Sequence, residues 1–135
     1  MHIIPIQIRF NDVDQMGHIN NAVIMEYFDL GKARYFADAG VPVTPDEGDF
    51  AVVIVHIEVD FHAQIHYHDK LAVTTYVANF GHKSLRVKQQ VVNADTLEPL
   101  ASCSTVMSGY SRKTQSAAII PDELKERVQR FDSTH

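Results

Sequence analysis

The chain has 135 residues, a formal net charge of -5 and one cysteine, so we expect a single domain over residues 1–135 without an internal disulfide. Its 45% hydrophobic and 21% charged residues are typical of a globular protein and exclude a disordered or collagen-like chain. The acidic balance disfavours nucleic acid and anionic membranes as partners. The N-terminus lacks the basic start and apolar core of a secretory signal, so we expect a cytoplasmic location.

The N-terminal part of the chain predicts a strand followed by a long helix. Ile6–Phe10 alternates apolar and polar residues, which is the pattern of a strand with one buried face. Over residues 20–39 the apolar residues recur at helical spacing, and the expected buried face carries Ile24, Phe28, Gly31, Tyr35 and Ala39, flanked by Val23, Tyr27 and Leu30. The expected helix limits are marked by Asn20, Asn21, Gly40 and Pro42. We expect this helix to be packed on most sides, with a narrow solvated edge formed by Glu26, Asp29 and Lys32.

After a polar loop over residues 42–49, the chain predicts four strands and a second helix. In the first strand, apolar residues from Val55 to Phe61 alternate with polar residues from His56 to His62. Three more strands are expected, at Leu71–Asn79, Ser84–Asn93 and Leu100–Tyr110. The second helix opens at Pro121 and carries Leu124, Val128 and Phe131 on one side.

This order of elements predicts an α+β fold. Short connections favour antiparallel neighbours, and a long helix is the natural cover for one face of the sheet. We therefore expect an antiparallel sheet of about five strands wrapped around one long central helix, with a short C-terminal helix. The regular alternation of residues 55–62 suggests an edge strand that pairs with a second copy of the chain.

The densest polar cluster is DVDQMGHINN, residues 12–21, directly before the long helix. A helix N-terminus presents free N–H groups and a partial positive charge, which suit an oxyanion that forms on a substrate carbonyl. The carboxylate of Asp14 lies upstream of this helix start and is able to attack a carbonyl or to remove a proton from water. Aspartate and asparagine also stabilise turns and cap helices, so the residues alone leave both interpretations open.

The segment RFNDVDQMGHINNAVIMEYFDLGKARYF, residues 9–36, resembles the signature of the 4-hydroxybenzoyl-CoA thioesterase-like branch of the hotdog-fold acyl-CoA thioesterases. The likeness lies mainly in the pattern Asp-x-Asp-x-x-Gly-His-x-Asn-Asn and continues more loosely through VVIVHIEVDF and later turns. It implies the hotdog fold, a homodimer with one continuous sheet that is often doubled to a homotetramer, and active sites at the subunit interface. It implies no metal and no redox cofactor.

The resemblance also assigns roles to individual residues. Asp14 matches the catalytic carboxylate, which acts as nucleophile or general base on the thioester. Backbone N–H groups near Asn20 and Asn21 are implied to polarise its carbonyl. Gly17 allows the backbone to approach the substrate closely, and His18 either contacts the substrate or fixes the loop.

Coenzyme A carries phosphates, so an acidic protein needs local cations to hold it. Lys83 lies in a turn that resembles the coenzyme A contact of the family, and Ser84 adds a hydroxyl group there. Further candidates are His82, Arg86, Arg112 and Lys113. Tyr27 is expected in the core or in the wall of the acyl pocket.

The sequence therefore predicts a thioesterase that converts an acyl-CoA to a free acid and coenzyme A. A hotdog hydratase or dehydratase is the alternative enzyme, and it would combine His18 with Glu26 or Glu58. Glu58 is also the backup catalytic carboxylate, although a solvated polar ladder or one across the dimer is the favoured explanation for it. A non-catalytic acyl-CoA binding protein is the third possibility. The histidines of residues 62–69 show no zinc-ligand spacing, so no metal site is expected.

Overall fold

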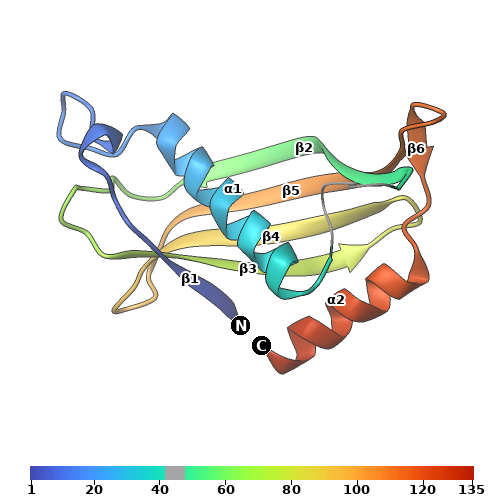
Figure 1. Cartoon of the computed structure of the whole chain (residues 1–135). Coiled ribbons are helices and arrows are strands. Elements are labelled where there is room, and N and C mark those ends of the chain that lie inside the picture. Colours follow the sequence, from blue (N-terminus) through green and yellow to red (C-terminus); the bar gives the residue numbers. More distant parts are fainter. Residues whose placement is uncertain (42–47) are drawn as a thin grey trace.

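The computed structural model describes residues 1–41 and 48–135 and places the long helix α1 across one face of an antiparallel sheet (Figure 1). The elements are β1 (His2–Ile6), a one-turn 3-10 helix (Phe10–Asp12), α1 (Asn21–Asp38), β2 (Phe50–Phe61), β3 (Leu71–Phe80), β4 (Ser84–Asn93), β5 (Pro99–Ser111), β6 (Ser116–Ala118) and α2 (Asp122–Thr134). The strand order is β1-β3-β4-β5-β2, and β6 pairs with the end of β5. The predicted α+β arrangement is confirmed, while most of the predicted loop at residues 42–49, including Pro42, lies outside the described residues.

The predicted first strand was wrong in position. The observed strand β1 ends at Ile6, where the prediction began, and pairs with β3 as an edge of the sheet. Pro5 has no backbone N–H to donate to a neighbouring strand. An edge strand tolerates this, because it pairs with a neighbour on one side only. Beyond it, Arg9 and Asp12 cap the 3-10 turn, and Phe10 is 82% exposed instead of being buried in a strand.

Helix α1 begins where its cap residues predict. The Asn20 side chain accepts a hydrogen bond from the Ala22 N–H at 2.8 Å, and Gly40 follows the helix in the left-handed conformation with φ +74. The expected buried face is confirmed. Two predictions at its margin were wrong: Lys32, expected on the solvated edge, is only 6% exposed, and Leu30, expected beside the buried face, is 52% exposed. The Lys32 ammonium meets the Asp29 carboxylate at 3.5 Å. The solvent-facing side of α1 is also broader in this chain than the predicted narrow edge.

Close packing fixes α1 on the sheet. A Cβ atom at Gly31 would lie 2.5 Å from Cγ1 of Val73 on β3, so only glycine permits this separation of helix and strand. Gln89 on β4 donates from Nε2 to the Phe28 carbonyl oxygen of α1 at 2.9 Å. These contacts determine where the N-terminus of α1 lies relative to the sheet.

The second helix, α2, joins the far end of the sheet to the C-terminal half of α1. Its Val128 is fully buried. Asp132 accepts hydrogen bonds from the Tyr35 hydroxyl at 2.6 Å and from the Val77 N–H at 3.1 Å. Neither helix of the described chain is long and apolar enough to cross a membrane.

Strand β2 is the second edge of the sheet, as predicted, and it is longer than the sequence suggested. Its register with β5 shifts between Ile54 and His56, which marks a bulge. Large apolar side chains on this strand are exposed in the single chain, and Val55 reaches 60%. Exposed apolar residues next to unpaired strand amides are unusual for a free sheet edge.

Candidate active site

Residues 12–20 form a closed loop before the start of α1. The Asn20 N–H donates to the Asp12 carbonyl oxygen at 3.2 Å, and the Asp14 N–H donates to the His18 carbonyl oxygen at 2.8 Å. Gly17 turns the chain in the left-handed conformation with φ +80, which glycine adopts without a steric penalty. The backbone of this polar segment is therefore held in a defined hairpin-like shape.

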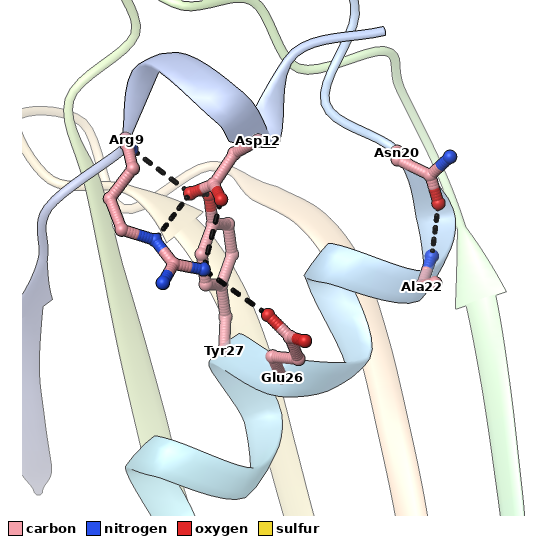
Figure 2. A network of polar contacts seen from close by, with 6 residues as sticks. All are labelled: Arg9, Asp12, Asn20, Ala22, Glu26 and Tyr27. Carbon is pink, nitrogen blue, oxygen red and sulfur yellow. Dashed lines mark hydrogen bonds and ion pairs between the residues drawn. The ribbon is translucent and has the colours of Figure 1, made fainter.

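A buried carboxylate ties this loop to the helix (Figure 2). Asp12 is only 2% exposed and accepts hydrogen bonds from the Arg9 backbone N–H at 2.9 Å and from the Tyr27 hydroxyl at 2.7 Å. The Arg9 guanidinium lies 3.0 Å from Asp12 and 3.3 Å from Glu26 on α1. Burial by itself raises the pKa of the Asp12 carboxyl, but the hydrogen bonds from Arg9 and Tyr27 outweigh it and lower that pKa below its usual value.

The Asp14 side chain is fixed by its own loop. Its Oδ1 atom accepts hydrogen bonds from the Met16 N–H at 2.9 Å and from the His18 N–H at 3.1 Å. Among the described residues no partner bonds to Oδ2. Asp14 is exposed and forms part of the wall of a pocket of about 510 Å³.

This pocket is built by two segments that are distant in the sequence. The first loop and α1 contribute Asp14, His18, Ile19, Asn20, Asn21 and Ile24. The end of β2 contributes Phe61, and the segment that follows it contributes His62, Ala63, Gln64 and Ile65. The Ile19 N–H donates to the Ile65 carbonyl oxygen at 2.7 Å and so joins the two segments. The predicted residues Asp14, His18, Asn20 and Asn21 therefore lie together, whereas Gly17 shapes the loop without lining the pocket.

The start of α1 offers one free amide to this pocket. The Asn20 N–H is occupied by Asp12, and the Ala22 N–H is occupied by the Asn20 side chain. The Val23 and Ile24 N–H groups both donate to the Asn20 carbonyl oxygen. In the part of the chain that the structure describes, the Asn21 N–H is left without an acceptor, which makes it the candidate donor to a substrate oxyanion.

Other predicted site residues lie elsewhere. Tyr27 points its hydroxyl to Asp12 and is absent from the wall of the Asp14 pocket. Glu58 on β2 also lies outside this pocket, and its bond to His56 at 2.7 Å lowers the pKa of the Glu58 carboxyl. The turn with His82, Lys83 and Ser84 lies at the opposite end of the sheet (Figure 1). Within one chain, the expected coenzyme A contacts and Asp14 are therefore not brought together.

The remaining cation candidates gather mostly at that opposite end. Arg112 and Lys113 donate from their backbone N–H groups to Asp49, at 3.0 Å and 2.6 Å. Arg86 on β4 donates to the Ser104 hydroxyl on β5 at 2.8 Å. No group of three or more histidine, cysteine, aspartate or glutamate side chains within residues 1–41 and 48–135 is arranged to hold a metal ion.

Sequence reasoning missed two parts of the site. It did not single out Arg9 and Asp12 as the anchor of the loop, although their three-residue spacing matches a capping turn. It also treated residues 62–69 only as possible metal ligands, whereas residues 61–65 form one wall of the pocket. No local signal pairs this segment with the Asp14 loop, because the contact depends on the folded sheet.

Comparison with known proteins identifies the family. A family model described as the thioesterase-like superfamily matches residues 8–128. The chain belongs to this superfamily. A 1,4-dihydroxy-2-naphthoyl-CoA hydrolase of Synechococcus elongatus is 22% identical over 125 residues, which cover 90% of this chain and 90% of the relative. The uncharacterized protein YsmA of Bacillus subtilis is 24% identical over 123 residues, which cover 91% of this chain and 82% of the relative.

Solved structures of thioesterases share the fold. A thioesterase of Thermus thermophilus, complexed with coenzyme A and Zn, matches with a TM-score of 0.80 and 29% identity, covering 97% of this chain and 93% of the other. A 1,4-dihydroxy-2-naphthoyl-CoA thioesterase from Synechocystis matches with a TM-score of 0.86 and 18% identity, covering 97% of each chain. The hotdog fold implied by the sequence resemblance is thereby confirmed.

Replacing the buried carboxylate of the loop anchor should lower stability in a pH-dependent way. The pKa of Asp12 is lowered in the folded protein, so its contribution is fully present above the unfolded value of about 3.9 and is lost as the pH falls through the folded value. We expect Asp12→Asn to reduce the free energy of unfolding by about 1–3 kcal/mol at pH 7 and by less at pH 3. Urea unfolding at both pH values measures this difference.

The matched control for this test is Asp95→Asn, which makes the same change in an exposed turn. It should alter the free energy of unfolding by no more than about 0.5 kcal/mol. If Asp12→Asn lowered the free energy of unfolding equally at pH 7 and pH 3, this would contradict a stabilising role of the ionised Asp12 carboxylate.

Proposed function

We propose that this protein is an acyl-CoA thioesterase, which hydrolyses the thioester of an acyl-CoA to a free acid and coenzyme A. The observation that carries the proposal is a pocket whose wall contains both the Asp14 carboxylate and the start of α1. Membership of the thioesterase-like superfamily supports it, as do relatives described as 1,4-dihydroxy-2-naphthoyl-CoA hydrolases.

In the proposed reaction, Asp14 and the helix start act on the same carbonyl group. The free Oδ2 of Asp14 either attacks the thioester carbon or takes a proton from the attacking water. The tetrahedral intermediate then collapses, the C–S bond breaks, and coenzyme A leaves as a thiolate that takes up a proton. Where Asp14 is the nucleophile, water hydrolyses the resulting acyl–aspartyl anhydride to the free acid. The Asn21 N–H and the partial positive charge of the helix N-terminus stabilise the negative oxygen of the tetrahedral intermediate. Such donors are important, since the loss of one typically slows acyl transfer by roughly 10²–10³. His18 contacts the substrate from the same wall.

The hydratase alternative finds less support in the positions of its acidic groups. Glu26 bonds to Arg9 at 3.3 Å and Glu58 bonds to His56 at 2.7 Å. Both glutamates lie outside the pocket that His18 lines. A carboxylate that acts together with an imidazole must reach the same substrate, so Asp14 is the better candidate partner of His18.

The complete site is proposed to form between two copies of the chain. A second copy that pairs antiparallel along β2 would cover the exposed apolar residues of this edge. Its strands would then run in the opposite direction, so its turn between β3 and β4 would come to the end of the sheet where the loop before α1 lies (Figure 1). This arrangement would join the two halves of the site that one chain keeps apart. A homotetramer would form from two such dimers.

Activity should depend on Asp14. The variant Asp14→Asn keeps a side-chain oxygen that accepts the two loop N–H bonds, so it should fold normally while losing at least about 10²-fold in kcat/KM. Release of free thiol from a panel of acyl-CoAs, from short and long aliphatic to aromatic, measures this and identifies the preferred acyl group. Asp95→Asn serves as the control.

The outcome separates the three candidate functions. Hydrolysis that survives in Asp14→Asn would point to another base. Silence across the panel, from a folded protein, would favour a hydratase or an acyl-CoA binding protein and would contradict the thioesterase proposal.

The assigned role of Lys83 rests on the phosphates of coenzyme A. Lys83→Ala should raise KM about tenfold for an acyl-CoA and leave KM nearly unchanged for the matching acyl-pantetheine, which lacks the nucleotide. Steady-state kinetics with both substrates measures the difference, and Lys125→Ala on α2 is the matched control. Equal effects on both substrates would remove Lys83 from the coenzyme A site.

A charge at the β2 edge should weaken the proposed dimer. Val55→Lys places a charge on the exposed apolar edge of β2 in both copies, which opposes strand pairing. Sedimentation velocity should show a shift toward monomer, accompanied by a loss of thioesterase activity. Ile119→Lys makes a similar change at a residue that is 55% exposed outside β2 and should leave the dimer intact. A stable, active Val55→Lys dimer would contradict this interface.

A further inference from the structure

Two histidines from different segments meet beside the Asp14 pocket. His18 of the first loop and His66 of the segment after β2 form an isolated antiparallel backbone bridge. Their rings lie edge to face, with centroids 5.0 Å apart and an interplanar angle of 76°. This is a favourable geometry for two aromatic rings, because the positive edge of one faces the electron-rich face of the other.

His66 is itself held by a carboxylate. Its backbone N–H donates to Oδ2 of Asp69 at 2.8 Å, and its ring Nδ1 lies 3.7 Å from the same oxygen. The Asp69 N–H returns a hydrogen bond to the His66 carbonyl oxygen at 3.1 Å. The turn from His66 to Asp69 is thus closed in both directions, and the ring of His66 rests against His18.

The two histidines differ in what they contact. His18 lines the pocket together with Asp14, whereas His66 is not part of its wall. The side chain of His66 is 57% exposed, so its burial contributes little to the stability of the fold. The contacts of the His66 ring therefore matter mainly for the orientation of the His18 ring.

We infer that His66 is a positioning residue, which fixes the imidazole of His18 at the pocket wall, and that Asp69 fixes His66. The inference rests on the proposed thioesterase function for the reaction that His18 assists. An imidazole on a loop rotates freely about its side-chain bonds, and a ring packed against it restricts that rotation. Correct orientation of a group that contacts the substrate can account for a large part of the rate enhancement of an enzyme.

A double-mutant cycle tests the inference. His66→Ala should lower kcat about tenfold with little change in KM, because the orientation of His18 is lost while substrate binding remains. In a His18→Ala background the same change should have no further effect. His66→Phe keeps the edge-to-face packing and should restore most of the activity. His68→Ala, an exposed histidine of the same segment, is the control and should behave as the natural protein.

A second measurement does not depend on activity. The ring resonances of His18, observed by NMR, should shift in His66→Ala and return toward their natural positions in His66→Phe. Unchanged His18 resonances in His66→Ala would overturn the inference, and so would an equal loss of kcat in both backgrounds of the cycle. Failure of the thioesterase proposal is recognised separately, by natural protein that hydrolyses no acyl-CoA or by an active Asp14→Asn variant.

Discussion

The close approach of α1 to β3 at Gly31 is the constraint on which the position of the candidate site depends. Without a side chain at Gly31, the helix lies directly against Val73, and Gln89 ties the helix backbone to β4. The N-terminus of α1 is then carried to one end of the sheet, where the segment after β2 meets it. Because protein cores are closely packed and deform little, a larger residue at this point would displace the Asn21 amide relative to Asp14 and the facing pocket wall.

Local sequence patterns predicted most of the fold. Strand β4 has the predicted limits, and the cap at Asn20 was correct, because alternation and capping depend on neighbouring residues. The first strand was misplaced because Arg9 and Asp12 prefer a capped turn, which the alternation of Ile6–Phe10 conceals. The burial of Lys32 also escaped prediction, since the apolar stem of a lysine can lie along a core while the sequence shows only its charge.

The candidate site was predictable only where its residues lie in one segment. The motif around Asp14 placed His18, Asn20 and Asn21 correctly in one pocket. The sequence did not predict that the Tyr27 hydroxyl donates a hydrogen bond to Asp12, because that bond joins the loop to the second turn of α1. The contribution of residues 61–65 to the pocket depends on strand order, and local periodicity gives no information about it.

Two backbone amides hold Oδ1 of Asp14, so the carboxylate cannot rotate freely and Oδ2 is presented in a single direction. A planar thioester has two faces, and a group restrained in this way reaches only one of them. In the proposed reaction the carbonyl oxygen must also point to the Asn21 amide, so one orientation of the substrate satisfies both requirements. The site would therefore distinguish the two prochiral faces of its substrate carbonyl, a selectivity that originates in the backbone of the loop and not in the side chains that contact the acyl group.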